Sequence, residues 1–144
     1  FSPNIWLLVG AAQGLRSDED ADAAIRLAAG LLAESLLVNQ GIKRLFRRTR
    51  PVHEDPRPHQ LRTPSTSSFP SGHASSAFTA AGLLSDTDPR LAPAYYALAV
   101  VVATSRIHVR IHHASDVVAG AAVGVGLAAA ITRRWPLPRR ASRG

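Results

Sequence analysis

A chain of 144 residues is long enough for one domain and short for two, so we expect a single domain over residues 1–144. The absence of cysteine excludes disulfide scaffolds, thiolate metal sites and cysteine nucleophiles. The net charge of +7 favours an anionic partner, and the charge is clustered, with seven of the 17 basic residues between Lys43 and Arg62 and five between Arg133 and Arg143.

The first predicted element is a helix over residues 20 to 50. Its start carries a cluster of acidic side chains, which suits the positive end of a helix dipole: Asp18, Glu19, Asp20 and Asp22. Its end is set by Pro51, because proline disfavours helix in the residue before it. Residues 51 to 70 then hold five prolines among Ser, Thr and His. A loop of this length in a compact domain is usually functional or disordered.

Three further helices are predicted after the loop, over residues 71 to 84, 92 to 106 and 115 to 132. No alternation of strands and glycine turns interrupts the helical pattern, so the expected fold class is all-α. If the four helices alternate up and down, the end of the first, the start of the second, the end of the third and the start of the fourth meet at one end of the bundle.

The apolar segments favour a membrane-embedded helical bundle. Residues 91 to 105 and 117 to 132 carry no charge, and they fall just short of the roughly 18 apolar residues typical of a spanning helix. Gly120, Gly124 and Gly126 suit close helix packing in lipid, although they would also suit a tightly packed soluble bundle. We therefore expect a bundle in a membrane, with the active site at one end of the helices.

The end where helices meet loops gathers cations, imidazoles, a hydroxyl and a carboxylate: Lys43, Arg50, Ser71, His73, Arg106, His112 and Asp116. Lys43, Arg47 and Arg50 would fall on one helical face, and arginine is the preferred bidentate partner of phosphate oxygens. The helix start at Ser71 and Gly72 offers backbone N–H groups to an anion. The set suits a phosphate and the charge of a phosphoryl-transfer transition state. For the basic run alone, a solvated face or an anionic-lipid contact is the alternative.

Two of the six histidines lie beside these phosphate-binding elements. A neutral His112 could attack phosphorus, with Asp116 one helical turn on holding the other ring nitrogen. A protonated His73 could give its proton to the leaving oxygen. The other four are expected at the surface or flanking the site: His53, His59, His108 and His113. A zinc site is not expected, because the sequence has no ligand set such as HExxH.

Three blocks of sequence resemble the motif of the type 2 phosphatidic acid phosphatase (PAP2) superfamily. They are Lys43-x6-Arg50-Pro51, then Pro70-Ser71-Gly72-His73, then Ser105-Arg106-x5-His112-x3-Asp116. This superfamily also includes bacterial acid phosphatases and vanadium haloperoxidases. The resemblance covers roughly residues 20 to 135 and leaves a basic tail over residues 136–144. The proline loop and the short turn between the middle helices are similar to those of small membrane-embedded lipid phosphatases of bacteria.

The resemblance implies a metal-independent phosphatase that needs no cofactor and forms a phosphohistidine. It implies that His112 is the nucleophile, His73 the general acid and Asp116 the orienting carboxylate. The phosphate would be bound by Lys43, Arg50, Ser71, Gly72 and Arg106. The implied substrate is a phosphomonoester or pyrophosphate of a lipid, such as phosphatidate, phosphatidylglycerophosphate or a polyprenyl-linked phosphate.

The resemblance also implies a multi-pass protein of the bacterial cell membrane. Usual members have more spanning helices than this chain offers, so we expect N-terminal helices to be missing, with a remnant at residues 5 to 15. Arg133, Arg134, Arg139 and Arg140 should stay cytoplasmic, which places the active site on the extracytoplasmic side. Similar domains occur fused to a lipid kinase, so a fused or partner lipid-kinase domain is a further expectation.

Two other functions compete with lipid phosphatase. A vanadium haloperoxidase would hold vanadate in the same anion pocket, but the resemblance there is to much longer soluble helical proteins. A non-enzymatic module that binds membrane or nucleic acid is supported by the basic charge, yet Phe46 is the only aromatic residue inside the basic run. We expect a membrane and a phosphorylated lipid as partners, and no nucleic acid.

Overall fold

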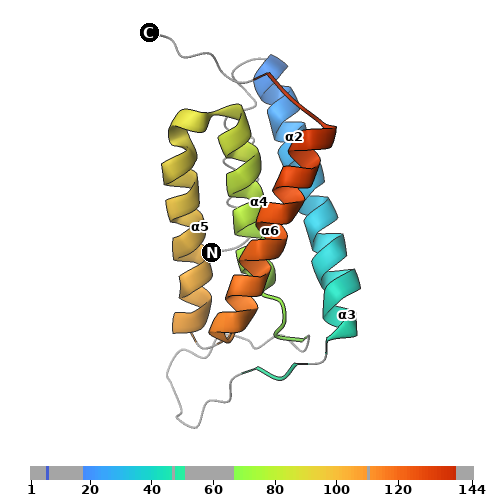
Figure 1. The fold of residues 1–144 in the computed structure, drawn as a ribbon, viewed down its shortest axis with the longest axis vertical. Coiled ribbons are helices and arrows are strands. Elements are labelled where there is room, and N and C mark those ends of the chain that lie inside the picture. Colours follow the sequence, from blue (N-terminus) through green and yellow to red (C-terminus); the bar gives the residue numbers. More distant parts are fainter. Residues whose placement is uncertain (1–5, 7–17, 47, 51–66, 110, 139–144) are drawn as a thin grey trace.

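The computed structural model describes residues 6, 18–46, 48–50, 67–109 and 111–138, and all its regular elements there are helical (Figure 1). The long helices are α2 (Asp18–Ser35), α4 (Gly72–Thr87), α5 (Ala92–His108) and α6 (Ala114–Arg134). Three short elements connect them: the π-helix η1 (Leu36–Ile42), α3 (Lys43–Leu45) and the 3₁₀ turn η2 (Pro89–Leu91). The predicted all-α class is confirmed for these residues.

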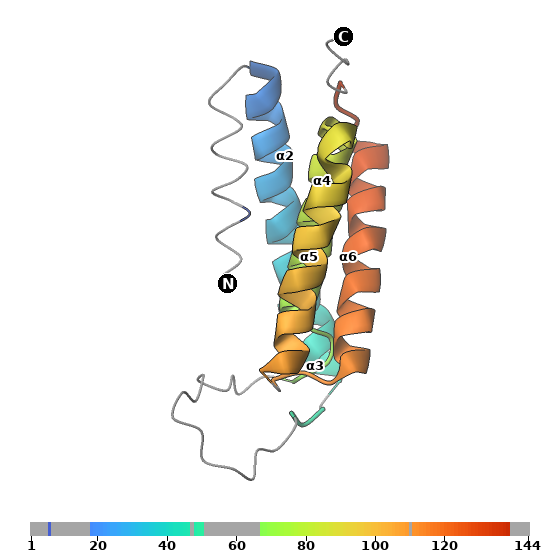
Figure 2. The same cartoon turned by 90° about the vertical axis from the view of Figure 1, so that its left-hand side faces the viewer.

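Helix α4 is the centre of the bundle and packs against α2, α5 and α6 (Figures 1 and 2). Small side chains allow this close packing, because α4 is rich in Ala, Ser and Gly. A Cβ at Gly120 of α6 would overlap the carbonyl oxygen of Ser71, the N-cap of α4, and a Cβ at Gly124 would overlap that of Ser75 in α4. The two glycines therefore let α6 approach the backbone of α4 closely, as small residues do at tight helix interfaces.

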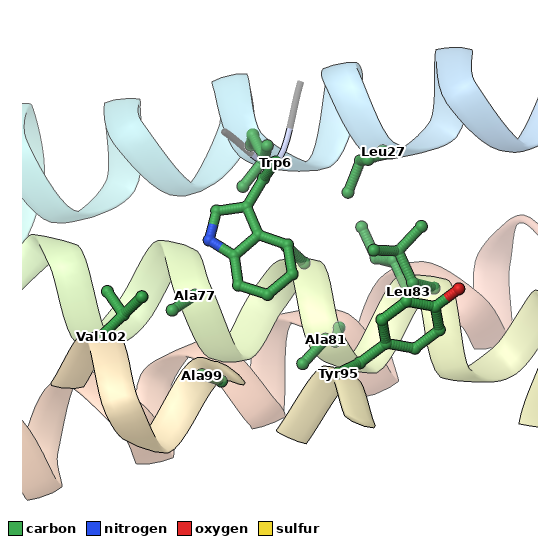
Figure 3. Packing of buried hydrophobic residues seen from close by; sticks show 12 residues of the cluster. Trp6, Leu27, Ala77, Ala81, Leu83, Tyr95, Ala99 and Val102 are labelled. Atoms are coloured by element: carbon green, nitrogen blue, oxygen red, sulfur yellow. The ribbon is translucent and has the colours of Figure 1, made fainter. Parts of the chain in front are cut away.

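The apolar core lies between these helices and combines five alanines with seven larger apolar side chains (Figure 3). Trp6 is 2 % exposed and points between the helices, near Ala77 and Ala81 of α4. Leu27 of α2 and Tyr95 of α5 also contribute to this cluster. Burial of such side chains stabilises a fold by roughly 1.5–3 kcal/mol each, so this cluster is the main apolar attachment of the outer helices to α4.

Arg26 joins three helices at the end of the bundle opposite α3. Its side chain is 1 % exposed and donates to the Leu83 carbonyl at 3.1 Å and to Thr87 Oγ1 at 3.0 Å in α4. It also binds Asp86 Oδ2 at 2.8 Å and the Trp135 carbonyl, at the end of α6, at 3.1 Å. A buried guanidinium needs such partners, and here they fix the far end of the bundle.

The predicted helices α4, α5 and α6 are confirmed within a few residues, whereas the predicted first helix is wrong at its end. Helical backbone stops at Leu45, and Phe46 is extended with φ −112° and ψ 115°. The chain leaves the helix there because residues 48 and 49 pair with Ser68, whose N–H donates to the Arg48 carbonyl at 3.0 Å and whose hydroxyl donates to the Thr49 carbonyl at 3.1 Å. Lys43 and Arg50 are therefore not on one helical face, and Arg47 lies outside the described residues.

Several other predictions fall on residues outside the described ranges. These are most of the loop with His53 and His59, the helical remnant at residues 5 to 15 apart from Trp6, and Arg139 and Arg140 in the tail. One described helix, Ala114–Arg134, is long and apolar enough to cross a membrane by length and composition, with a hydropathy of 1.8 over its best window.

Candidate active site

The candidate site lies at one end of the bundle. The end of α3, the start of α4, the end of α5 and the start of α6 all lie at this end (Figures 1 and 2). This is the up-and-down arrangement that the sequence predicts, and it brings the three sequence blocks together although they lie far apart in the chain.

His112 sits in the turn between α5 and α6 and is 5 % exposed. The turn is closed by the Arg106 carbonyl, which accepts from the backbone N–H groups of Ile111 and His112. The His112 Nδ1 lies 2.8 Å from the Ser68 carbonyl oxygen. A carbonyl can only accept, so Nδ1 carries the proton and Nε2 keeps the lone pair. The contact thus favours the tautomer in which Nε2 keeps its free lone pair.

Asp116, in the first turn of α6, is fully buried, and both of its carboxylate oxygens are occupied. Oδ1 accepts from Arg48 Nη1 at 2.8 Å, and Oδ2 accepts from the His113 backbone N–H at 2.9 Å. The distance from Oδ2 to His112 Nδ1 is 3.8 Å, which is too long for a hydrogen bond. The expected hydrogen bond from the imidazole to Asp116 is therefore replaced by one to the Ser68 carbonyl, and the carboxylate acts on His112 through its charge.

Arg50 places its guanidinium beside Nε2 of His112. Its Nη1 donates to the Ile111 carbonyl at 3.0 Å and lies 3.4 Å from His112 Nε2. Its Nη2 lies 3.4 Å from the Ser67 carbonyl oxygen. These contacts hold the guanidinium beside the atom that would attack a phosphorus, which is where a phosphate-binding arginine is needed.

Lys43, the first residue of α3, lies in space beside the start of α4. A Cβ added to Gly72 would be 3.4 Å from Lys43 Nζ, so the ammonium group is close to the first backbone N–H groups of that helix. The Lys43 Nζ donates to Asn39 Oδ1 at 2.9 Å, one turn earlier in η1. Asn39 in turn donates to Ser35 Oγ at 3.1 Å. This pair of contacts directs the lysine toward α4, and neither partner was singled out from the sequence.

Ser71 lies at the start of α4, as the sequence predicts. Its hydroxyl accepts from the Ala74 N–H at 3.4 Å as the N-cap of α4, and its own N–H donates to the Asp116 carbonyl at 2.9 Å. The residue is fully buried. Ser71 thus starts the helix and ties it to α6, which leaves the N–H groups of Gly72 and His73 as the anion donors that the first turn of a helix offers.

Burial and the neighbouring cations disfavour the protonated form of both imidazoles in the site. Burial and the charge of Arg106 lower the pKa of His73 to about 4, and His112 and Lys43 act in the same direction. Burial and the charge of Arg50 lower the pKa of His112 to about 4, against the opposite effects of the Ser68 carbonyl and Asp116. Both imidazoles are therefore neutral at pH 7. A dianion bound among these groups would relieve the repulsion between the cations.

All eight predicted site residues lie at this end of the bundle, and the structure adds Arg48, Ser68 and Asn39 to them. Arg48 belongs to the basic run in the sequence, but nothing in the run distinguishes it from its neighbours. In the part of the chain that the structure describes, no three His, Asp or Glu side chains gather closely enough to hold a metal ion. The structure therefore defines an all-α protein whose imidazoles, cations and helix N–H groups gather at one end of the bundle.

Comparison with known sequences identifies the family within that class. The sequence profile of the PAP2 superfamily matches residues 23–140, and the chain belongs to this superfamily. It is 39% identical over 116 residues to a decaprenylphosphoryl-5-phosphoribose phosphatase of Mycolicibacterium smegmatis, a match that covers 80% of this chain and 62% of that protein. It is 43% identical over 90 residues to the protein of the same name in Mycobacterium tuberculosis H37Rv, covering 62% and 49%. The chain thus spans about half to three fifths of these relatives. No solved structure matches it.

Proposed function

We propose that this chain is the phosphatase domain of a membrane enzyme that removes the terminal phosphate of a polyprenyl-linked lipid through a phosphohistidine on His112. The observation that carries the proposal is the tautomer of His112, whose Nδ1–H is held by the Ser68 carbonyl at 2.8 Å while Nε2 faces Arg50 at 3.4 Å. Membership of the PAP2 superfamily and the names of the two mycobacterial relatives support it.

In the first step, Nε2 of neutral His112 attacks the phosphorus and the bond to the lipid oxygen breaks. The lysine and arginine side chains, Lys43, Arg50 and Arg106, and the N–H groups of Gly72 and His73 stabilise the equatorial oxygens. The imidazole gains positive charge as the phosphorus–nitrogen bond forms. Asp116, 3.8 Å from Nδ1, and the Ser68 carbonyl stabilise that charge, as the carboxylate of a triad does for its histidine.

His73 supplies the proton for the leaving oxygen. Its pKa of about 4 leaves it neutral in the empty site, so the proton must come with the substrate or after it binds. A phosphomonoester has a second pKa near 6 and arrives partly as the monoanion, whose proton can pass to His73. The dianion left beside the imidazolium then raises the pKa of His73. In the second step His73 takes a proton from water, which hydrolyses the phosphohistidine.

The outer surface of the bundle supports a position in a lipid membrane. Apolar side chains point outward from all three outer helices, with exposures of 63% for Leu32 in α2, 55% for Val101 in α5 and 69% for Val118 in α6. Polar side chains are inside, among them Glu34 and Thr79. Only 28% of the apolar window of α6 is buried by protein. An exterior of this kind suits hydrocarbon, and it would place the apolar tail of a lipid beside the phosphate site.

Phosphate release from a panel of lipids tests the proposal. The purified chain in detergent is given decaprenylphosphoryl-5-phosphoribose, a polyprenyl pyrophosphate, phosphatidate and phosphatidylglycerophosphate. We expect fastest release from the first and none from the His112→Ala variant. The matched control is His108→Ala, which removes an exposed histidine from the end of α5 and should keep full activity. Release that survives His112→Ala, or none from any lipid, would contradict the proposal.

We further propose that the active-site end faces the extracytoplasmic side, because Arg133 and Arg134 end α6 at the opposite end of the bundle. The chain has no cysteine, so single cysteines can be introduced without a background. In intact cells an impermeant thiol reagent should reach a Gln60→Cys variant and not a Leu137→Cys variant. Labelling of position 137 with protection of position 60 would reverse the orientation.

A further inference from the structure

Arg48 is connected to His112 along two separate routes. Its Nη1 donates to Asp116 Oδ1 at 2.8 Å and to Ser115 Oγ at 2.8 Å. Its backbone carbonyl accepts from the Ser68 N–H at 3.0 Å, and the Ser68 carbonyl holds His112 Nδ1 at 2.8 Å. The same residue therefore fixes both groups that act on Nδ1 of the imidazole: the carboxylate and the carbonyl.

The charge of Asp116 requires such a partner. The carboxylate is 0% exposed, and a buried charge is costly unless it is paired. The His113 N–H satisfies Oδ2 but carries no net charge. Arg48 is the cation in contact with Oδ1, reaching it from the surface with 43% of its side chain exposed. Arg48 thus sets how much negative charge the imidazole of His112 experiences from Asp116.

Arg48 and Arg50 differ in what they face. Nη1 of Arg50 lies beside Nε2 of His112, the attacking atom, whereas Nη1 of Arg48 is bound to Ser115 and Asp116 on the Nδ1 side. The contacts of Arg48 therefore fix the groups on the Nδ1 side of the imidazole, whereas those of Arg50 place a cation beside Nε2.

We propose that Arg48 is a positioning residue, which holds Asp116 and the Ser67–Phe69 segment so that His112 keeps its reactive tautomer and orientation. This inference rests on the proposed function in one respect, namely that His112 is the nucleophile. It adds a residue that lies between Lys43 and Arg50 in the first sequence block.

The removal of Arg48 has a measurable effect on His112 besides activity. The groups that face the imidazole are Arg50 and Lys43, which disfavour its protonation, and Asp116 and the Ser68 carbonyl, which favour it; His73 shares the site. In Arg48→Met the charge of Asp116 is no longer neutralised, so imidazolium becomes more favourable and the pKa of His112 rises.

The experiment is an NMR titration of the ring-labelled histidines in the full chain, in detergent. Four variants are compared with the unmodified protein: Arg48→Met, Arg48→Lys, Asp116→Asn and the Arg48→Met/Asp116→Asn double variant. We expect the pKa of His112 to rise in Arg48→Met and this rise to be absent when Asp116→Asn is the background. The control is Arg44→Met, which removes an exposed arginine that donates to Gln40 and should leave the titration unchanged.

Single-turnover phosphorylation gives the second readout. We expect Arg48→Met to slow phosphoenzyme formation by about 10- to 100-fold, as loss of a group that orients a reacting residue does, with the half-saturating lipid concentration unchanged. Arg48→Lys keeps the charge, so it should keep the pKa of His112. Its side chain is one bond shorter than the path to Arg48 Nη1, which donates to both Ser115 and Asp116, so we expect it to hold Asp116 less well and still slow the reaction. If Arg48→Met does not fold, the phosphorylation rate of Arg48→Lys decides whether Arg48 is a positioning residue.

Three results would overturn the proposal: a pKa of His112 that is the same in Arg48→Met as in the unmodified protein, a rise that persists in the double variant, or a higher half-saturating concentration at an unchanged rate. The last would make Arg48 a phosphate ligand. If the unmodified protein hydrolyses no lipid phosphate, the proposed function fails, while the titration still decides the role of Arg48.

Discussion

The close approach of α6 to α4 predicts opposite effects for two glycine-to-alanine substitutions two residues apart in α6. In Gly124→Ala the new Cβ would overlap the Ser75 carbonyl oxygen and lie 3.0 Å from both Phe78 Cβ and Thr79 N. Since ordinary C···O contacts are about 3.3–3.6 Å, the helices must separate by roughly 1 Å. In Gly126→Ala nothing lies within 4 Å of the new Cβ.

The magnitudes follow from three terms. Overpacking costs about 1–3 kcal/mol, and separation of the helices weakens the bond from Thr79 Oγ1 to the Gly124 carbonyl at 3.3 Å, which is worth about 1 kcal/mol. Alanine returns about 1 kcal/mol of helix propensity in either variant. Gly124→Ala should therefore lower the free energy of unfolding by about 1–3 kcal/mol, whereas Gly126→Ala should raise it by up to about 1 kcal/mol.

Thermal unfolding of the two variants and the unmodified protein in the same detergent measures the difference. A change of 2 kcal/mol corresponds to roughly 8 °C for a chain of this size. Equal melting temperatures for Gly124→Ala and Gly126→Ala would show that the close contact of Gly124 with α4, which Gly126 lacks, does not limit the packing of the two helices.

Three further predictions concern the site itself. The free energy of unfolding should fall as the pH is lowered from 6.5 to 4, by up to about 3 kcal/mol from His112 alone. The reason is that the pKa of His112 is lowered from 6.5 to about 4 in the folded state, so the unfolded chain binds an extra proton in this range. Melting curves across this range check it, and an equal dependence of stability on pH in His112→Asn would count against it. EDTA should leave phosphate release unchanged and orthovanadate should inhibit it, since side-chain cations and helix N–H groups bind the trigonal-bipyramidal state; loss of activity in EDTA that Mg²⁺ restores would overturn this. His73→Ala should slow phosphoenzyme formation by about 10²- to 10⁴-fold with a lipid alkoxide leaving group and much less with nitrophenolate; equal losses in that single-turnover rate would remove His73 from the acid role.

Sequence reasoning predicts the helices of this chain well where local signals fix their ends. Ser71 caps α4 with its hydroxyl, and Asp88 with Pro89 separates α4 from α5, so these boundaries were correct within a few residues. The end of the first helix was wrong because it is set by long-range pairing of residues 48 and 49 with Ser68. Pro51 explains why the helix cannot continue past residue 50, but it gives no sign of the earlier exit at Phe46.

The candidate site could likewise be predicted from the sequence only in part. The residues in the three motif blocks could be predicted to converge, because the up-and-down order of the helices brings their ends together. The partners of those residues could not be predicted: the Ser68 carbonyl accepts from Nδ1 of His112, and Arg48 donates to Asp116. These partners depend on the path of an extended segment, for which the sequence carries no periodic signal. The interior position of the Ser71 hydroxyl depends on the close approach of α6, which is likewise a tertiary property.

In the proposed mechanism Nε2 of His112 forms a covalent bond to phosphorus. Rapid quenching of the purified chain with radiolabelled lipid phosphate, followed by peptide mapping at alkaline pH, measures this directly, because phosphohistidine survives base and is lost in acid. We expect an acid-labile label on the peptide that contains His112, present in His108→Ala and absent in His112→Ala. A label on any other residue, or phosphoenzyme that persists in His112→Ala, would contradict it.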